Sequence, residues 1–253
     1  MSGHNKWSSI KHKKGAADAK RGKLFSRLAK EITVAARSGG GDPEMNPRLR
    51  SAIDAAKNAN VPNDNIERAV KKGTGDLEGG PLEELTYEGY GPGGVAIMVL
   101  CLSDNRNRTA ANLRACFSRH NSSLGANGAV AWMFNRKSRF VVEGEKADEM
   151  HLMEVLIEAG VDAEEIEVDD GRAEIIAPFE AFESVSNALH EAGVPVSEST
   201  ITLLPETFMQ LDDAGEARQN MRLIEALEDD EDVQAVYSNL GFSERLMKEL
   251  SKE

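Results

Sequence analysis

Residues 166–177 read IEVDDGRAEIIA, two short runs containing apolar residues that are separated by Asp170 and Gly171. An Asp-Gly pair readily adopts the positive φ angles of a two-residue turn, so this stretch predicts a β-hairpin. The pattern predicts a strand (SRFVVEG) and a helix (ADEMHLMEVLIEAG) before it, and a helix (FEAFESVSNALHEAG) and a strand (ESTITLL) after it. The order β-α-β-β-α-β is that of a ferredoxin-like lobe, which we place at residues 135–205.

The segments on either side of this lobe predict a second α/β lobe. Upstream, TYEGYGPGGVAIMVLCL predicts a strand, a Gly-rich turn and a buried strand; NRTAANLRACFSRHN predicts a helix and GAVAWMF a strand. Downstream, EARQNMRLIEALEDDEDVQAVYSNL supplies a helix and a strand that this ββαβ order lacks. We therefore expect a discontinuous lobe made of residues 76–134 and 206–241, with the lobe 135–205 inserted into it and a tail at 242–253.

Residues 1–75 have helical rather than strand-like periodicity. Four apolar residues fall on one helical stripe: Leu24, Leu28, Ile32 and Ala35. Asn46 before Pro47 is typical of a helix N-cap followed by the first helical residue, and a third helix is expected between an Asn63 cap and Gly73. The predicted fold class is α+β: an N-terminal basic domain of three helices plus two ferredoxin-like lobes, the second inserted into the first.

The charge of the chain is segregated. The whole chain has a formal net charge of -13, yet residues 1–75 contain 16 Lys and Arg against 7 Asp and Glu. The remaining 178 residues contain 14 basic against 36 acidic side chains. Such an asymmetry indicates that the N-terminal part binds an anionic partner, since Lys and Arg that neutralise phosphates release counterions.

We expect the nucleic-acid contacts in the basic N-terminal arm, where the Trp7 indole is available to stack on a base. The candidate residues are Lys6, Trp7, Lys11, His12, Lys13, Lys14, Lys20, Arg21, Lys23 and Arg27. The residues before Gly15 are expected to be mobile without nucleic acid. The alternative is a disordered arm that only keeps the protein in solution. His4 and His12 have no Cys or carboxylate nearby, so no metal site is expected there.

Arg106 and Arg108 form a second candidate contact, at the start of a helix that follows a buried strand. A helix N-terminus favours acidic rather than basic side chains, so arginines there would be explained by a bound anion. The alternative is that Asn107 or Thr109 caps the helix and the arginines are merely solvated.

The remaining motifs predict structural roles. The stretch YEGYGPGG predicts a tight turn with an exposed Tyr90, and the acidic run at 225–234 predicts a helix end and a solvent-facing surface. Cys101 and Cys116 have the apolar surroundings of core residues in a reducing compartment.

No catalytic constellation, metal-ligand set or cofactor motif is found, so no enzyme is predicted. The sequence contains no apolar run of membrane-spanning length, and we expect a cytoplasmic protein.

Three long segments closely resemble the YebC/PmpR family: GHNKWSSIKHKKGAADAKRGKLFSRLAKEI, GGGDPEMNPRLRSAIDAAKNANVPNDNIERAVKKGTG and YEGYGPGGVAIMVLCLSDNRNRTAANLR. The usual family pattern GHSKW departs here at Asn5. The resemblance implies a helical N-terminal domain and two α/β domains, one inserted in the other. It also implies a cytoplasmic transcriptional regulator that binds promoter DNA. Mitochondrial relatives act as translational activators, and bacterial members are also connected with the ribosome and with relief of stalling.

The combined expectation is a non-enzymatic, monomeric regulator of gene expression that binds DNA, with promoter DNA as its partner. The alternative is a translation factor that binds ribosomal RNA or the ribosome, since neither a base-reading helix face nor RNA-binding aromatic motifs are found. A protein adaptor that uses the acidic lobes would leave the basic arm without a role.

Overall fold

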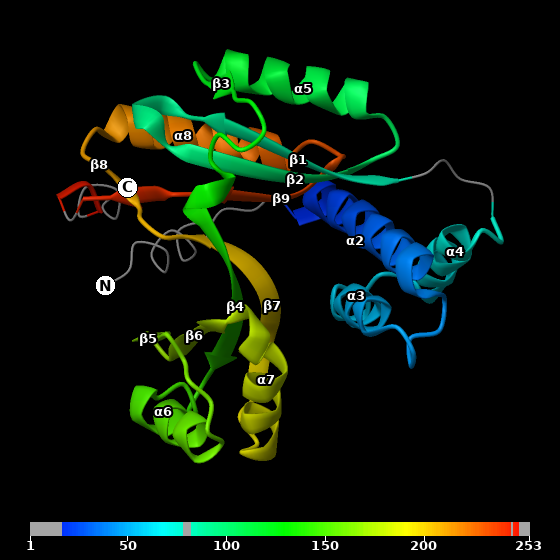
Figure 1. Cartoon of the computed structure of the whole chain (residues 1–253), viewed down its shortest axis with the longest axis vertical. Helices are drawn as coiled ribbons and strands as arrows, with labels where there is room; N and C mark the ends of the chain where they lie inside the picture. Colours follow the sequence, from blue (N-terminus) through cyan, green and yellow to red (C-terminus); the bar gives the residue numbers. More distant parts are fainter. Residues whose placement is uncertain (1–16, 78–81, 244, 248–253) are drawn as a thin grey trace. The chain divides into compact units, whose positions relative to one another are not determined.

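The computed structural model describes residues 17–77, 82–243 and 245–247, with side chains described from residue 22 onward. The chain forms two compact units. Of the described residues, one unit contains those between 17 and 131, between 211 and 238 and between 243 and 247, and the other contains Trp132–Gln210 and Asn239–Phe242. Figure 1 shows the elements of each unit coloured along the sequence. No helix in the described ranges has the length and apolar character that a membrane span requires.

Three helices form the N-terminal part of the first unit: α2 (Ala17–Gly39), α3 (Pro47–Asn58) and α4 (Asn63–Thr74). Their shared core is apolar and consists of Ile32, Ala35, Ala36, Leu49, Ala52, Ala56, Val61, Ile66 and Ala69. The predicted start of α3 is confirmed, because the Asn46 side chain accepts a hydrogen bond from the Leu49 N–H and Pro47 is the first helical residue. Leu24 departs from the predicted stripe, since its side chain is exposed.

The predicted ends of α4 need correction. Asn63 is the first helical residue and not the cap, because the preceding Pro62 occupies the cap position without a side-chain hydrogen bond. The helix continues past Gly73 to Thr74, and its C-cap is Gly75, whose φ of 90° lies in the left-handed region. Gly73 instead lets two helices approach closely, since a Cβ there would lie 2.5 Å from the Thr33 carbonyl oxygen of α2.

The first unit also contains an antiparallel sheet of strand order β3-β1-β2-β9. Its strands are β1 (Glu83–Tyr90), β2 (Ala96–Ser103), β3 (Ser123–Leu124) and β9 (Val233–Ser238). Figure 1 shows α5 (Arg106–Arg119) and α8 (Ala214–Glu228) on the same face of this sheet. The predicted turn between β1 and β2 is confirmed as the short helix η1 (Pro92–Gly94). Tyr90 is half-buried and not exposed, because its hydroxyl donates to the Ala129 carbonyl.

The prediction of a strand at residues 128–134 is wrong. The short β3 takes that place beside β1, and the loop that follows it is fastened by Glu88. The Glu88 carboxylate is buried and accepts hydrogen bonds from the N–H groups of Gly128, Val130 and Ala131, at 2.6, 2.7 and 2.8 Å. These residues then lead into η2 (Ala131–Met133). A loop whose N–H groups are bound by a carboxylate has no need of strand partners.

The second unit is built on an antiparallel sheet of order β5-β6-β4-β7. Its elements are β4 (Phe134–Glu143), α6 (Glu149–Glu158), β5 (Glu165–Asp169), β6 (Arg172–Pro178), η3 (Phe179–Ala181), α7 (Phe182–Glu191) and β7 (Val196–Pro205). The predicted β-α-β-β-α-β order is therefore observed. The hairpin is confirmed, with φ of 47° at Asp170 and 74° at Gly171, as a two-residue turn with both central φ angles positive requires.

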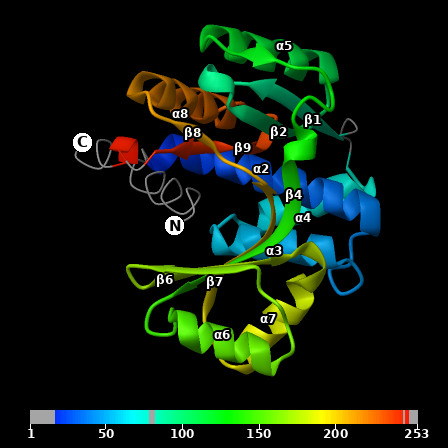
Figure 2. The ribbon, with the colours of Figure 1, turned by 60° about the vertical axis from the view of Figure 1, so that its left-hand side comes forward.

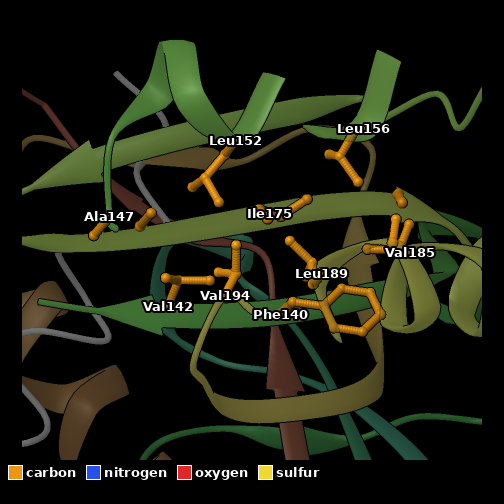
Figure 3. Packing of buried hydrophobic residues seen from close by; sticks show 12 residues of the cluster. Phe140, Val142, Ala147, Leu152, Leu156, Ile175, Val185, Leu189 and Val194 are labelled. Atoms are coloured by element: carbon orange, nitrogen blue, oxygen red, sulfur yellow. The ribbon is translucent and has the colours of Figure 1, made fainter. Parts of the chain in front are cut away.

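Both helices of this unit cover one face of its sheet (Figure 2). In Figure 3, Leu152 and Leu156 point from α6 toward Ile175 of the sheet, and Phe140 lies next to Leu189 of α7. These side chains belong to a core that is almost fully shielded from solvent. On β4, Arg139 is buried in an ion pair with Glu174, 2.5 Å between Nε and Oε1. A two-stranded ribbon of β8 (Met209–Leu211) and β10 (Leu240–Phe242) follows in the chain.

Both cysteines are free thiols. Cys101 is buried in β2, and burial raises its pKa to about 12; Cys116 is half-buried on α5, and burial raises its pKa as well. A thiol with a raised pKa is a poor nucleophile, which agrees with the predicted core role.

Candidate nucleic-acid interface

Besides Arg37 in its last turn, the described part of α2 presents Lys23, Arg27 and Lys30 on one face at i, i+4 and i+7, and we call these three residues the α2 row. All three contact residues 228–232, which we call the acidic turn. Lys23 pairs with Asp229 at 2.8 Å, and the Arg27 guanidinium donates to the carbonyl of Glu228. Cations are favoured at this position because the carbonyl end of α8 carries a partial negative charge.

Asp232 is the centre of this contact and is only 4% exposed. Its carboxylate accepts hydrogen bonds from Lys30 at 2.9 Å, from Arg108 at 2.9 Å and from the hydroxyl of Thr109 at 2.8 Å. Burial alone would raise the pKa of Asp232, but the hydrogen bonds from Lys30, Arg108 and Thr109 outweigh it and lower that pKa to about 2. The acidic run is thus solvent-facing as predicted at Asp229 and Glu231, but not at Asp232.

The start of α5 differs from the predicted capping by Asn107 or Thr109. Asn105 is the cap, with its side chain accepting from the Arg108 N–H at 3.0 Å. Thr109 is buried and donates inward to Asp232. Arg108 contacts Asp104 and Asp232, both at 2.9 Å, whereas Arg106 is exposed with a long 3.5 Å contact to Glu83. Of the two arginines, Arg106 is the one open to an external anion.

A groove of about 860 Å³ runs beside these contacts. Its basic lining comes from Lys30, from Arg68 and Lys72 of α4 and from Arg108 of α5, and its acidic lining from Asp104 and residues 229–232. Arg68 and Lys72 have no ion-pair partner within the described ranges, and the same holds for the exposed Lys71 beside them. These three side chains form a basic patch on the second half of α4, which we call the α4 basic patch.

The α4 basic patch was not predicted from the sequence. The signal was present, because Arg68, Lys71 and Lys72 are spaced at i, i+3 and i+4 and the last two turns of α4 contain no acidic residue after Glu67. Two exposed residues of α5, Arg114 and Arg119, were also missed; neither has an ion-pair partner in the described part of the chain.

Several predicted contacts lie outside the described structure. The residues concerned are Lys6, Trp7, Lys11, His12, Lys13 and Lys14, together with the predicted mobility before Gly15. Lys20 and Arg21 lie in α2, but their side chains are not described. The structure therefore brings together Lys23, Arg27 and Arg108 around the acidic turn and leaves the arm untested. Among the described residues, no group of three or more His, Cys, Asp or Glu is placed to hold a metal ion.

Comparison with known proteins covers both parts of the chain. Residues 5–76 match the family model described as the TACO1/YebC protein N-terminal domain, and residues 82–240 match the TACO1/YebC second and third domain. A protein of Desulfosudis oleivorans described as a "Probable transcriptional regulatory protein" is 58% identical over 244 residues, which is 96% of this chain and 98% of that protein. A Geobacter sulfurreducens protein with the same description is 51% identical, covering 99% of this chain and 100% of its own.

A solved structure is also similar. The crystal structure of a conserved hypothetical protein from Aquifex aeolicus superimposes with a TM-score of 0.82 at 47% sequence identity. The match covers 93% of this chain and 96% of that one, so the same helical and α/β elements are shared along nearly the whole length. The chain belongs to the TACO1/YebC family.

Proposed function

We propose that this protein is a non-enzymatic regulator of transcription that binds DNA through its basic helical region. The observation that carries the proposal is the α4 basic patch: Arg68, Lys71 and Lys72 have no acidic partner in the described structure, on a chain whose net charge is -13. An unneutralised basic patch on an acidic protein attracts a polyanion to one face and repels it elsewhere. The relatives described as transcriptional regulators support DNA as that polyanion.

We propose that the N-terminal arm supplies further nucleic-acid contacts. Its lysines and arginines (Lys6, Lys11, Lys13, Lys14, Lys20, Arg21) and His12 would contact phosphates, and Trp7 would stack on a base. Arg106 supplies a second contact at the start of α5, where its guanidinium is exposed.

A phosphate competes with the acidic turn for three of the predicted contact residues: Lys23, Arg27 and Arg108. In the free protein they contact Asp229, the Glu228 carbonyl and Asp232, so a phosphate must replace these groups before it binds there. The α4 basic patch requires no such exchange, and Arg106 has only its long 3.5 Å contact with Glu83 to give up. We therefore assign the first contacts to the patch and the arm, and later contacts to the α2 row.

We infer the domain boundaries from the order of the strands in the two sheets. We assign a helical domain to residues 1–75, a discontinuous lobe to 76–134 and 206–241, an inserted ferredoxin-like lobe to 135–205 and a tail to 242–253. The pairing of β9 with β2, after all four strands of the other sheet have passed in the sequence, supports the insertion. We further propose that the protein acts in the cytoplasm as a monomer.

RNA is the second candidate ligand, with a role in translation at the ribosome. The observation that favours it is the kind of side chain in the α4 basic patch. Lys and Arg positioned for phosphates carry no sequence information, and such contacts serve a folded RNA as well as a DNA duplex.

UV cross-linking in cells followed by sequencing separates the two candidates. The full chain is compared with the double variant R68E/K71E and with R222E/R245E, which reverses two other exposed arginines. We expect promoter DNA to be enriched with the wild type and the control, and lost with R68E/K71E. Cross-links at discrete positions of ribosomal RNA that depend on Arg68 and Lys71 would instead support the second candidate, a role in translation. Equal recovery from all three proteins would refute the proposed interface.

A further inference from the structure

The outer face of α6 carries apolar residues where a surface helix normally carries polar ones. Met150, Met153 and Ile157 lie at i, i+3 and i+7 and are 82%, 46% and 68% exposed. The adjoining side of the helix supplies Leu152 and Leu156 to the core, as Figure 3 shows. The apolar arc of α6 is therefore wider than the stripe that its own core needs.

The other helix of the same unit shows that this is not a general property of the lobe. α7 buries Val185, Ala188 and Leu189 in the same core. Its exposed positions are all polar: Glu183, Ser184, Asn187, His190 and Glu191. Scattered exposed apolar side chains are ordinary, but three at helical spacing form a continuous stripe that marks an interaction site.

The charges around the stripe restrict what can cover it. Glu154 and Glu158 are exposed beside Met150 and Ile157, and Glu149 begins the helix. The segment Trp132–Gln210, which contains α6, has 18 acidic and 5 basic residues. Nucleic acid and anionic lipid surfaces are repelled by such a charge. A second copy of this chain would bring the same glutamates face to face, which also opposes pairing.

We propose that the Met150–Met153–Ile157 stripe docks an amphipathic helix of a partner protein whose apolar side is flanked by Lys or Arg. The apolar residues of the partner would pack on the stripe, and its cations would face Glu154 and Glu158. Methionine suits this role, because its unbranched and polarisable side chain adapts to a partner surface. The site lies in a different unit from the α4 basic patch, so it does not depend on nucleic-acid binding.

The test measures binding of a fluorescein-labelled helical peptide of Leu and Lys, about five turns long, to the full chain at about 150 mM salt. Its Leu residues are spaced at i, i+3, i+4 and i+7, and a matched peptide carries Glu in place of Lys. The variant M150Q/I157Q replaces two of the three stripe residues with glutamine. Glutamine is polar and a good helix former, so the helix should be retained at these exposed positions. The control M45Q/L77Q removes two exposed apolar residues outside this unit. Circular dichroism checks that all three proteins are folded.

We expect the Lys peptide to bind the wild type and M45Q/L77Q equally, and M150Q/I157Q at least about tenfold more weakly, which corresponds to about 1.4 kcal/mol. The Glu peptide should not bind. Equal affinity for wild type and M150Q/I157Q, binding of the Glu peptide as tight as that of the Lys peptide, or no binding of the Lys peptide would overturn the proposal. A wild-type dimer in sedimentation that M150Q/I157Q dissociates would also overturn it, because the occupant would then be a second copy.

Discussion

Lys30 and Asp232, about 200 residues apart in the sequence, form an ion pair of 2.9 Å in which the Asp232 side chain is only 6% exposed. Lys30 also donates to the carbonyls of Glu231 at 2.8 Å and Leu102 at 3.2 Å. One side chain of α2 thus binds the acidic turn and the end of β2 together. Because a carboxylate so placed is costly to leave without its cations, this pair couples the helical region to the first sheet.

Asp232→Asn is expected to destabilise the protein by roughly 2 kcal/mol at neutral pH, from the lowering of its pKa from 3.8 to about 2. The folded pKa lies below the unfolded value, so the carboxylate stabilises the fold above about pH 4. That contribution is lost as the pH falls through about 2. Urea unfolding at several pH values measures the difference between wild type and D232N. The difference should shrink below about pH 4; a constant difference would contradict the assignment, and the exposed control D162N should show none.

Glu88→Gln is expected to loosen the loop at residues 125–131. The carboxylate accepts three backbone N–H groups, and an amide of the same shape offers a single acceptor oxygen and a donor that clashes with them. A loss of about 1–3 kcal/mol follows from leaving these backbone donors, including the buried N–H of Val130, without their acceptor. Hydrogen exchange at Gly128, Val130 and Ala131 should speed up, while the exposed control E145Q leaves it unchanged. Unaltered protection in E88Q would show that the loop is held by other contacts.

The sequence predicted best the features that depend on neighbouring residues. The Asn46–Pro47 start of α3 and the Asp170–Gly171 hairpin were found because caps and two-residue turns follow from local backbone chemistry. The strand expected at 128–134 was wrong for the opposite reason. Its apolar residues resembled a strand, but the Glu88 carboxylate, 40 residues earlier, binds the N–H groups that a strand would have used.

The candidate site was less predictable than the fold. The segregated charge indicated that the helical region binds an anionic partner. It did not show that Lys23 and Arg27 face the acidic turn, since the two segments are about 200 residues apart. The buried position of Asp232 was hidden in the same way, inside a run of acidic residues that otherwise faces solvent. Sequence patterns predict whether a surface is positively or negatively charged. Only the fold shows which of those charges are already paired with each other.

Glycine substitutions test the close packing of α2 on α4. Gly73→Ala places a Cβ 2.5 Å from the Thr33 carbonyl and 2.6 Å from the Ala36 Cβ, so it should destabilise the protein by about 1–3 kcal/mol. Gly22→Ala makes the same chemical change on α2 with no atom within 4 Å, and should stabilise it by about 0.5–1 kcal/mol. Thermal unfolding measures both. A Gly73→Ala protein as stable as the wild type would contradict the described packing.

Neutralising the acidic turn should strengthen nucleic-acid binding. The variant D229N/D230N removes carboxylates that face Lys23 and the groove, so a phosphate meets less competition for the α2 row. We expect affinity for duplex DNA to rise several-fold at low salt. The control E145Q/D162N changes the net charge equally at exposed sites of the other unit. Equal gains for both variants would mean that net charge alone is responsible and that the acidic turn does not compete.

The most direct measurement is the affinity of the full chain for a labelled DNA duplex, followed by fluorescence anisotropy from about 50 to about 200 mM salt. The account predicts that wild type and R222E/R245E bind alike, with affinity falling steeply as salt rises. It predicts that R68E/K71E loses at least about tenfold in affinity and has a shallower salt dependence, because two phosphate contacts are removed. The same affinity and salt slope for R68E/K71E and R222E/R245E would contradict the α4 basic patch as the nucleic-acid interface.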